Sequence, residues 1–103
     1  MLPILSVPIT VQPEALEFIK REGLQDVFEK ALAYVAQTAA QARKIRVVLE
    51  MDENAACLCA TIEVILAEGD PAEEKLSHLF YDWLREHLPR ESLFSFSIYV
   101  TWE

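Results

Sequence analysis

Two cysteines, Cys57 and Cys59, are the side chains of this sequence best suited to bind a soft metal or to carry redox chemistry. They stand two residues apart in an apolar run, so on a β-strand both thiols point to the same side. A structural zinc site requires four ligands and usually spaces its cysteines further apart, around a turn. The chain has no third cysteine, and a disulfide between these two would be strained. We therefore expect two small packing residues, with no metal ligand and no cofactor.

His78 and Asp82 are a second pair that could do acid–base chemistry, because residues four apart meet on one face of a helix. The other histidine, His87, is expected on the apolar face of the same helix, in the last turn, where a cation is favourable. No serine or cysteine near them stands in a nucleophile motif, and no glycine-rich loop is present to hold a phosphate. The pattern is typical of a solvated helix face, so we predict no catalytic residue and no enzyme.

The charge of the chain limits its partners. It carries 17 acidic and 9 basic side chains, which gives a net charge of −8 over 103 residues. Such a field repels phosphate backbones and anionic membranes, so we expect neither nucleic acid nor a membrane as partner. A basic protein partner or a cation suits this charge better. Glu50, Asp52 and Glu53 could hold a hard cation loosely, although they do not follow the spacing of a calcium loop.

Targeting and membrane signals are not evident in the sequence. No apolar stretch approaches the roughly 18 residues of a membrane span. Residues 1–11 lack the positive region and the small-residue cleavage site of a signal peptide. Two cysteines are also too few for a secreted disulfide scaffold. We therefore expect a soluble, cytoplasmic protein.

Glycine, proline and aspartate divide the chain into the elements that must position these residues. We expect an extended segment over 4–11, helices over 13–42 with a break at Gly23, a β-hairpin of strands 44–52 and 56–67, a helix over 71–88 and a last strand over 93–102. Asp70 is a favourable N-cap for the later helix, and Pro89 ends that helix.

The order β-α-β-β-α-β predicts a single α+β domain over residues 1–103 with the ferredoxin-like βαββαβ arrangement. That arrangement is a two-layer sandwich, with helices on one face of an antiparallel sheet. Pro8 argues against the central place of the first strand in it, because proline has no N–H for the ladder. The alternative is an αββαβ core with an N-terminal arm along one edge. Residues 4–11 are therefore open to three interpretations: a central strand, an edge strand or an arm.

The two-residue period of the strands assigns each side chain to one face of the sheet. In the last strand, the row expected to face the helices comprises Phe94, Phe96, Ile98, Val100 and Trp102. The other side of the sheet mixes apolar and small polar residues, and we predict that it binds a partner through Val48, Ile65, Ser97, Tyr99 and Thr101. We expect a twofold homodimer there. Pairing along the edge of the last strand is the rival geometry, and an ordinary half-solvated face is the alternative to both.

Four short segments carry a resemblance: 45–52 (IRVVLEMD), 80–84 (FYDWL), 88–89 (LP) and 96–99 (FSIY). They resemble a loose group of small, acidic, uncharacterised bacterial proteins, some of which are encoded beside toxin-like nucleases. The resemblance implies an antitoxin-like or accessory role.

The charge and the lack of a convergent polar cluster favour a non-enzymatic protein–protein interaction module. We expect it to self-associate and to act as an antitoxin-like, accessory or chaperone-like protein. The alternative is a small-molecule or cation-binding domain, with a minor enzymatic role, that uses a cleft between the sheet and the helices.

Overall fold

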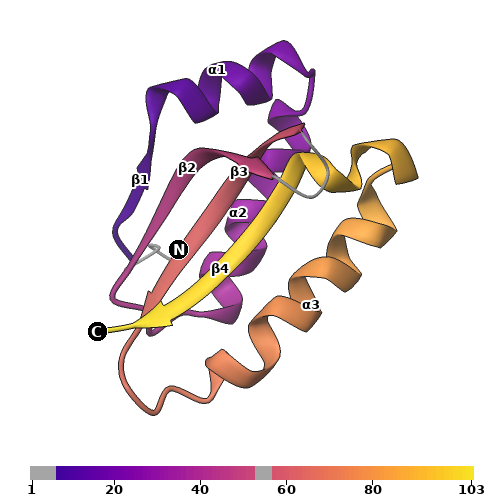
Figure 1. Cartoon of the computed structure of the whole chain (residues 1–103). Helices are drawn as coiled ribbons and strands as arrows, with labels where there is room; N and C mark the ends of the chain where they lie inside the picture. The colour runs from indigo at the N-terminus through magenta and orange to yellow at the C-terminus, as the bar shows by residue number, and fades with distance from the viewer. Residues whose placement is uncertain (1–6, 53–56) are drawn as a thin grey trace, which may run out of the picture.

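The computed structural model describes residues 7–52 and 57–103, which form a four-stranded mixed sheet with helices packed on it (Figure 1). In chain order the elements are β1 (Ile9–Val11), α1 (Pro13–Arg21), α2 (Gln25–Thr38), β2 (Lys44–Asp52), β3 (Cys57–Leu66), α3 (Ala72–His87), the 3-10 helix η1 (Arg90–Ser95) and β4 (Phe96–Trp102). The predicted α+β class is confirmed. Residues 4–6 of the expected first strand and residues 53–56 at the hairpin turn lie outside the described residues.

Backbone chemistry decides where the helices begin and end. Pro13 stands in the first turn of α1, where its missing N–H costs nothing. Gly23 separates α1 from α2 with a φ of 71°, a conformation that glycine adopts without strain. Before α3, the carboxylate of Asp70 accepts a hydrogen bond of 2.9 Å from the N–H of Ala72. The predicted break at Gly23 is therefore confirmed. Asp70 does bond the first turn as predicted, but α3 begins at Ala72, so Pro71 and not Asp70 directly precedes the helix.

The sheet is built around the predicted β2–β3 hairpin, whose strands pair antiparallel from Lys44 opposite Ile65 to Asp52 opposite Cys57. β1 adds to β2 in parallel, and β4 adds to β3 in parallel. The strand order is therefore β1-β2-β3-β4, so that the first and the last strand are the two edges.

The ferredoxin-like strand order is not confirmed by this sheet. That arrangement places the first strand in the centre of an antiparallel sheet, whereas β3 and β4 pair directly and in parallel, which leaves no central place for β1. β1 has only three residues and lies at the edge. Pro8, directly before it, is tolerated there because an edge strand needs ladder partners on one side only. The N-terminal segment thus lies where the alternative with an arm placed it, paired with β2 as a short strand.

Within each parallel pair, a helical crossover connects the two strands: α1 and α2 connect β1 to β2, and α3 connects β3 to β4. Both crossovers lie on the same face of the sheet, since Tyr34 of α2 stacks on Trp83 of α3 with ring centroids 5.8 Å apart. The pairs run in opposite directions, because β2 and β3 are antiparallel. Two such crossovers must have opposite hands, and in Figure 1 the left-handed one runs from β1 through α1 and α2 to β2. Strand twist strongly favours right-handed crossovers, but a strand of three residues imposes little twist on the connection that follows it.

The hydrophobic core lies between the helices and one face of the sheet. Its largest fully buried side chains are Ile19, Val35, Ile45, Val47, Ile62, Val64, Leu66, Leu76, Phe80 and Leu84. From β4, Phe96 is buried and stacks on Phe28 of α2 with ring centroids 6.2 Å apart.

Two aromatic residues differ from the prediction that they face the core. Phe94 is 64% exposed, because it belongs to η1, which replaces the first residues of the expected last strand. Trp102 is 52% exposed, because it is the last residue of an edge strand. Between them, Phe96, Ile98 and Val100 do face the core.

Phe80→Ala should lower the free energy of unfolding by about 3–5 kcal/mol, because Phe80 is fully buried in the core. The matched variant Phe94→Ala removes the same atoms from an exposed ring and should cost about 1 kcal/mol or less. Urea unfolding followed by circular dichroism measures both. Similar losses for the two variants would contradict the packing described for α3 and η1.

Candidate functional site

The side of the sheet away from the helices carries a continuous set of side chains, called here the open face. Its members alternate with the core residues along β2, β3 and β4 and comprise Lys44, Arg46, Val48, Glu50, Cys57, Cys59, Thr61, Glu63, Ile65, Ser97, Tyr99 and Thr101. Figure 1 shows α2 behind the strands, and within residues 7–52 and 57–103 no helix lies in front of them. The open face is therefore the largest surface of the sheet that the described helices leave free.

Where the open face spans β2, β3 and β4, the register arranges it in three adjacent cross-strand rows, and Glu50, Cys57 and Cys59 lie beyond these rows toward the hairpin end. These rows are Val48–Thr61–Ser97, Arg46–Glu63–Tyr99 and Lys44–Ile65–Thr101. The five residues predicted to bind a partner, Val48, Ile65, Ser97, Tyr99 and Thr101, all lie within them. The structure thus brings together side chains from three strands that sequence periodicity assigned to one face.

The five residues differ in how much surface they offer to a partner. Tyr99 is 58% exposed, whereas Val48, Ser97 and Thr101 are half-buried. Ile65 is only 3% exposed, so its side chain can contribute little to a contact. Tyr99, in the middle row, is therefore the principal anchor that the open face presents.

The centre of the open face holds a small polar cluster. The hydroxyl oxygens of Thr61 and Ser97 are 2.7 Å apart, and the Sγ of Cys59 lies 3.6 Å from the first and 3.7 Å from the second. Thr61 is buried, and buried hydroxyls are stable only when they have hydrogen-bond partners. The three side chains therefore hydrogen-bond to one another within the sheet and need no ligand as a hydrogen-bond partner.

Three of the four charged residues described on the open face, Lys44, Arg46 and Glu63, have an ion-pair partner, and Glu50 is the exception. Arg46 and Glu63 are opposite each other in the β2–β3 register, with a nitrogen–oxygen distance of 3.3 Å. At the end of the face, Lys44 and Glu103 approach to 4.0 Å. Both pairs join different parts of the chain, so the charges of this face are largely neutralised within it.

Metal-binding residues are not assembled in the part of the chain that the structure describes. Cys59 is buried and Cys57 is half-buried. No group of three His, Cys, Asp or Glu side chains among the described residues is arranged to hold a metal ion. Of the carboxylates considered for a cation, Glu50 is exposed on the open face, while Glu53 and the side chain of Asp52 lie outside the described residues.

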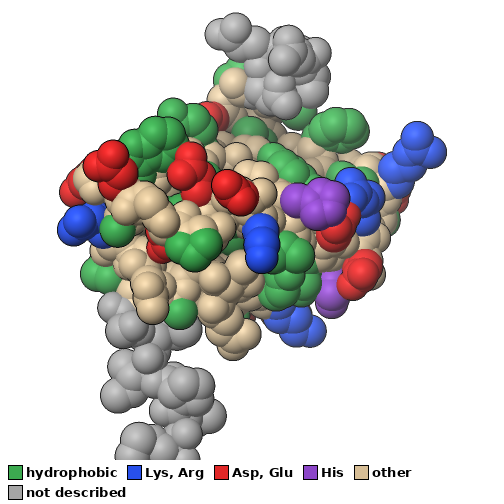
Figure 2. Space-filling model, turned by 90° about the horizontal axis from the view of Figure 1, so that it is seen from below, with side chains coloured by type: hydrophobic (Ala, Val, Ile, Leu, Met, Phe, Trp, Pro, Cys, Tyr) green, Lys and Arg blue, Asp and Glu red, His purple; other side chains and the backbone are tan. Residues whose placement is uncertain are grey.

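The two histidines lie on the surface of α3 among charged side chains (Figure 2). His78 and Asp82 approach to 3.2 Å, and Arg85 pairs with the same carboxylate. His87 differs from the prediction that it faces the core: it is exposed, its Nδ1 lies 2.8 Å from the carbonyl oxygen of Trp83, and its ring stacks on that indole at 4.0 Å. These contacts stabilise the exposed side of the helix and enclose no space for a substrate.

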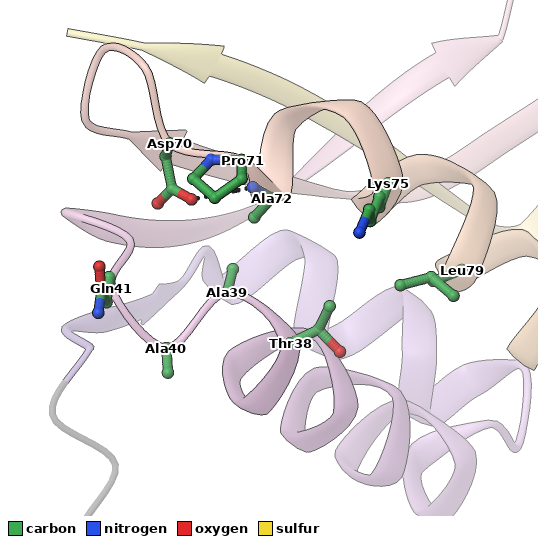
Figure 3. A pocket seen from close by; sticks show the side chains of 9 residues that line it. All are labelled: Thr38, Ala39, Ala40, Gln41, Asp70, Pro71, Ala72, Lys75 and Leu79. Carbon is green, nitrogen blue, oxygen red and sulfur yellow. Dashed lines mark hydrogen bonds between the residues drawn. The ribbon is translucent and has the colours of Figure 1, made fainter.

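A cavity of about 380 Å³ lies between the C-terminal end of α2 and the N-terminal end of α3 (Figure 3). Its polar side chains are Thr38, Gln41, Asp70 and Lys75, and the remaining lining is apolar. The Asp70 carboxylate is already bonded to the N–H of Ala72. A small-molecule site needs several polar groups that converge on the ligand. Because Asp70 is engaged by the backbone, Thr38, Gln41 and Lys75 are the polar side chains of this cavity left for a ligand, and the alternative of a small-molecule binder depends on these three.

Sequence reasoning missed a second apolar surface, at the hairpin end of the sheet. Met51 and Leu58 share the core-facing side of the strands but are 57% and 36% exposed. The signal lies in the element lengths: nine residues of β2 span about 30 Å, whereas the 14 and 16 residues of α2 and α3 span about 21–24 Å. Helices α2 and α3 are thus shorter than the hairpin, and although α1 also packs on β2 and β3, Met51 and Leu58 stay exposed.

No family model, curated protein or solved structure matches this chain. None of the helices in the described residues is both long and apolar enough to cross a membrane. The function must therefore be argued from the residues and from their geometry.

A double-mutant cycle on the polar cluster tests the geometry of the open face. Thr61→Val and Ser97→Ala should each lower the free energy of unfolding by about 1 kcal/mol, because each leaves a hydroxyl partner unpaired or removes a hydrogen bond. The double variant should cost less than the two single costs together, by about 0.5–1.5 kcal/mol, since the two side chains interact. Urea unfolding measures all four proteins, and strictly additive costs would contradict the contact.

Proposed function

We propose that this protein is a non-enzymatic protein–protein interaction module that forms a homodimer through its open face. The observation that carries the proposal is the position of Tyr99, a large and 58% exposed side chain in the middle row of a face that the described helices leave free. Exposed aromatic side chains dominate the energetics of many interfaces. A twofold contact lets one such surface serve both copies.

The internal hydrogen bonds of the open face lower the free-energy cost of removing water from it when a partner binds. A polar group that loses water without gaining a partner costs about 1–3 kcal/mol. Here Thr61 and Ser97 already bond each other, and Arg46 and Glu63 are already paired. Among the open-face side chains that the structure describes, Glu50 is the acid without an ion-pair partner, and it stands next to the hairpin end. A second copy can therefore cover the centre while breaking few contacts with water.

The charge distribution also favours this face for self-association. The whole chain carries a net charge of −8, so two copies repel each other along most approaches. On the open face, Lys44 and Arg46 each stand beside an acidic partner, Glu103 and Glu63. The local charge is therefore small, and two copies meet there with less repulsion than elsewhere.

An accessory role in the cytoplasm fits such a module. The acidic balance suits a basic partner protein, as is the case for antitoxins, immunity proteins and small chaperones. A resemblance supports the same role. The segments at 45–52, 80–84, 88–89 and 96–99 resemble a group of proteins, some of which are encoded beside toxin-like nucleases. We therefore include in the proposal an antitoxin-like or chaperone-like action on a basic protein.

Tyr99→Glu should convert the dimer to a monomer, because it replaces the principal anchor of the contact by an unpaired charge. Light scattering at micromolar concentration measures the mass in solution, and circular dichroism confirms that the variant is folded. Trp102→Glu is the matched control: it adds the same charge at another exposed aromatic residue of β4 and should leave the dimer intact.

Two results would overturn the proposed dimer. One is a wild-type protein that stays monomeric at high concentration. The other is a dimer that withstands Tyr99→Glu but dissociates with Trp102→Glu, which would place the contact at the end of the β4 edge.

A further inference from the structure

Three large apolar side chains meet where the hairpin extends past the helices: Met51, Leu58 and Phe94, called here the hairpin-end patch. Met51 and Leu58 are direct partners in the β2–β3 register. Phe94, in η1, lines one hollow together with Met51 and a second hollow together with Leu58. All three are exposed, Phe94 most of all. Because Phe94 borders both hollows, the patch is one continuous surface and not three isolated side chains.

The two hollows on either side of Phe94 can accept apolar side chains. The first has a volume of about 520 Å³ and includes Tyr81, Leu93 and Phe96 beside Met51 and Phe94. It adjoins the open face, since Glu50, Cys59 and Ser97 complete its lining. The second has a volume of about 270 Å³ and includes Phe18 beside Leu58 and Phe94. Both hollows have polar residues in their lining as well, and each has apolar side chains next to Phe94. An exposed aromatic ring between two such hollows is suited to the ridge of side chains along one face of an amphipathic helix.

The rim of the patch is acidic. Glu50 borders the larger hollow, and Glu22 and Glu91 border the smaller one. Among the described residues that line either hollow, Arg21 is the basic one, and its guanidinium lies over the ring of Phe18, 6.0 Å from the centroid. The apolar centre is therefore surrounded by more negative than positive charge, which adds to the net charge of −8 of the chain.

An apolar centre with an acidic rim favours some binding partners over others. A second copy of the chain would bring the same acidic rim and be repelled. An anionic membrane surface would be repelled for the same reason. A segment with apolar side chains on one face and Lys or Arg on its flanks matches both properties of the surface.

We infer that the hairpin-end patch is the docking site for a basic amphipathic helix of a partner protein. The inference rests on the proposed function as an interaction module and names the chemistry of its partner, but it does not depend on the dimer. The apolar face of the helix fills the two hollows beside Phe94. Its flanking Lys or Arg side chains pair with Glu50, Glu22 and Glu91.

A fluorescent peptide of about 14 residues, or about four helical turns, tests this site by fluorescence anisotropy. The probe carries Leu on one face and Lys on the other. Two control peptides are needed: one with Glu in place of every Lys, and one with the same Leu and Lys in a scrambled order that is not amphipathic. We expect the amphipathic Lys peptide to bind, and to bind more weakly as salt rises. The two controls should bind at least about tenfold more weakly.

Variants of the protein then locate the contact. Phe94→Ser should weaken binding of the probe by about tenfold or more, as expected for a central aromatic anchor. Glu50→Gln combined with Glu91→Gln should weaken it less and should reduce its salt dependence. Trp102→Ser is the matched control, since it removes another exposed aromatic side chain away from the patch, and it should leave binding unchanged. Urea unfolding establishes that each variant is folded.

The inference is overturned if the probe does not bind, if the Glu or the scrambled peptide binds equally well, or if Phe94→Ser and Trp102→Ser weaken binding equally. The dimer is read separately, by light scattering on the same variants. Phe94→Ser should retain the wild-type mass, so a failure of the docking site and a failure of the dimer give different results.

Discussion

Burial of one face of the β2–β3 hairpin under α1, α2 and α3 is the interaction on which the other features of this protein depend. Ile45, Val47, Ile62 and Val64 point to the same side of two paired strands and are fully buried there. Because side chains of a strand alternate between faces, this burial turns the intervening residues to the opposite side. The open face is thus a direct consequence of the core, and its composition decides whether it is left to water or covered by another molecule.

Two surfaces of different character result from the same packing. The open face is nearly neutral and its polar groups are paired internally, so its own copy is a suitable partner. The hairpin-end patch has an acidic rim around exposed apolar side chains, so a basic amphipathic segment is a suitable partner. The first lies behind the core face and the second at the hairpin end, and they adjoin at Glu50, Cys59 and Ser97, which line the larger hollow of the patch.

The sheet contains features that local sequence patterns predict and a strand order that they do not. The break at Gly23, the hairpin and the bond of Asp70 to the first turn of α3 depend on neighbours in sequence, and all three were predicted. The strand order depends on which strand pairs with each free edge of the hairpin, and the ferredoxin-like order was not confirmed. β3 and β4 pair directly, and the short β1 joins β2 by a left-handed crossover that no periodicity in the sequence signals.

The sequence by itself determined the class of the fold, the order of the elements along the chain and the face to which each strand residue points. It did so because helix and strand periods, caps and turn residues are local properties. Only the tertiary structure decided the exposure of Phe94, Trp102 and His87, the burial of Ile65, and the joining of Met51, Leu58 and Phe94 into one patch. These outcomes depend on where η1 replaces a strand, on which residues end an edge strand and on how far the helices reach along the sheet. Such lengths and contacts between elements far apart in the chain are set by packing in three dimensions.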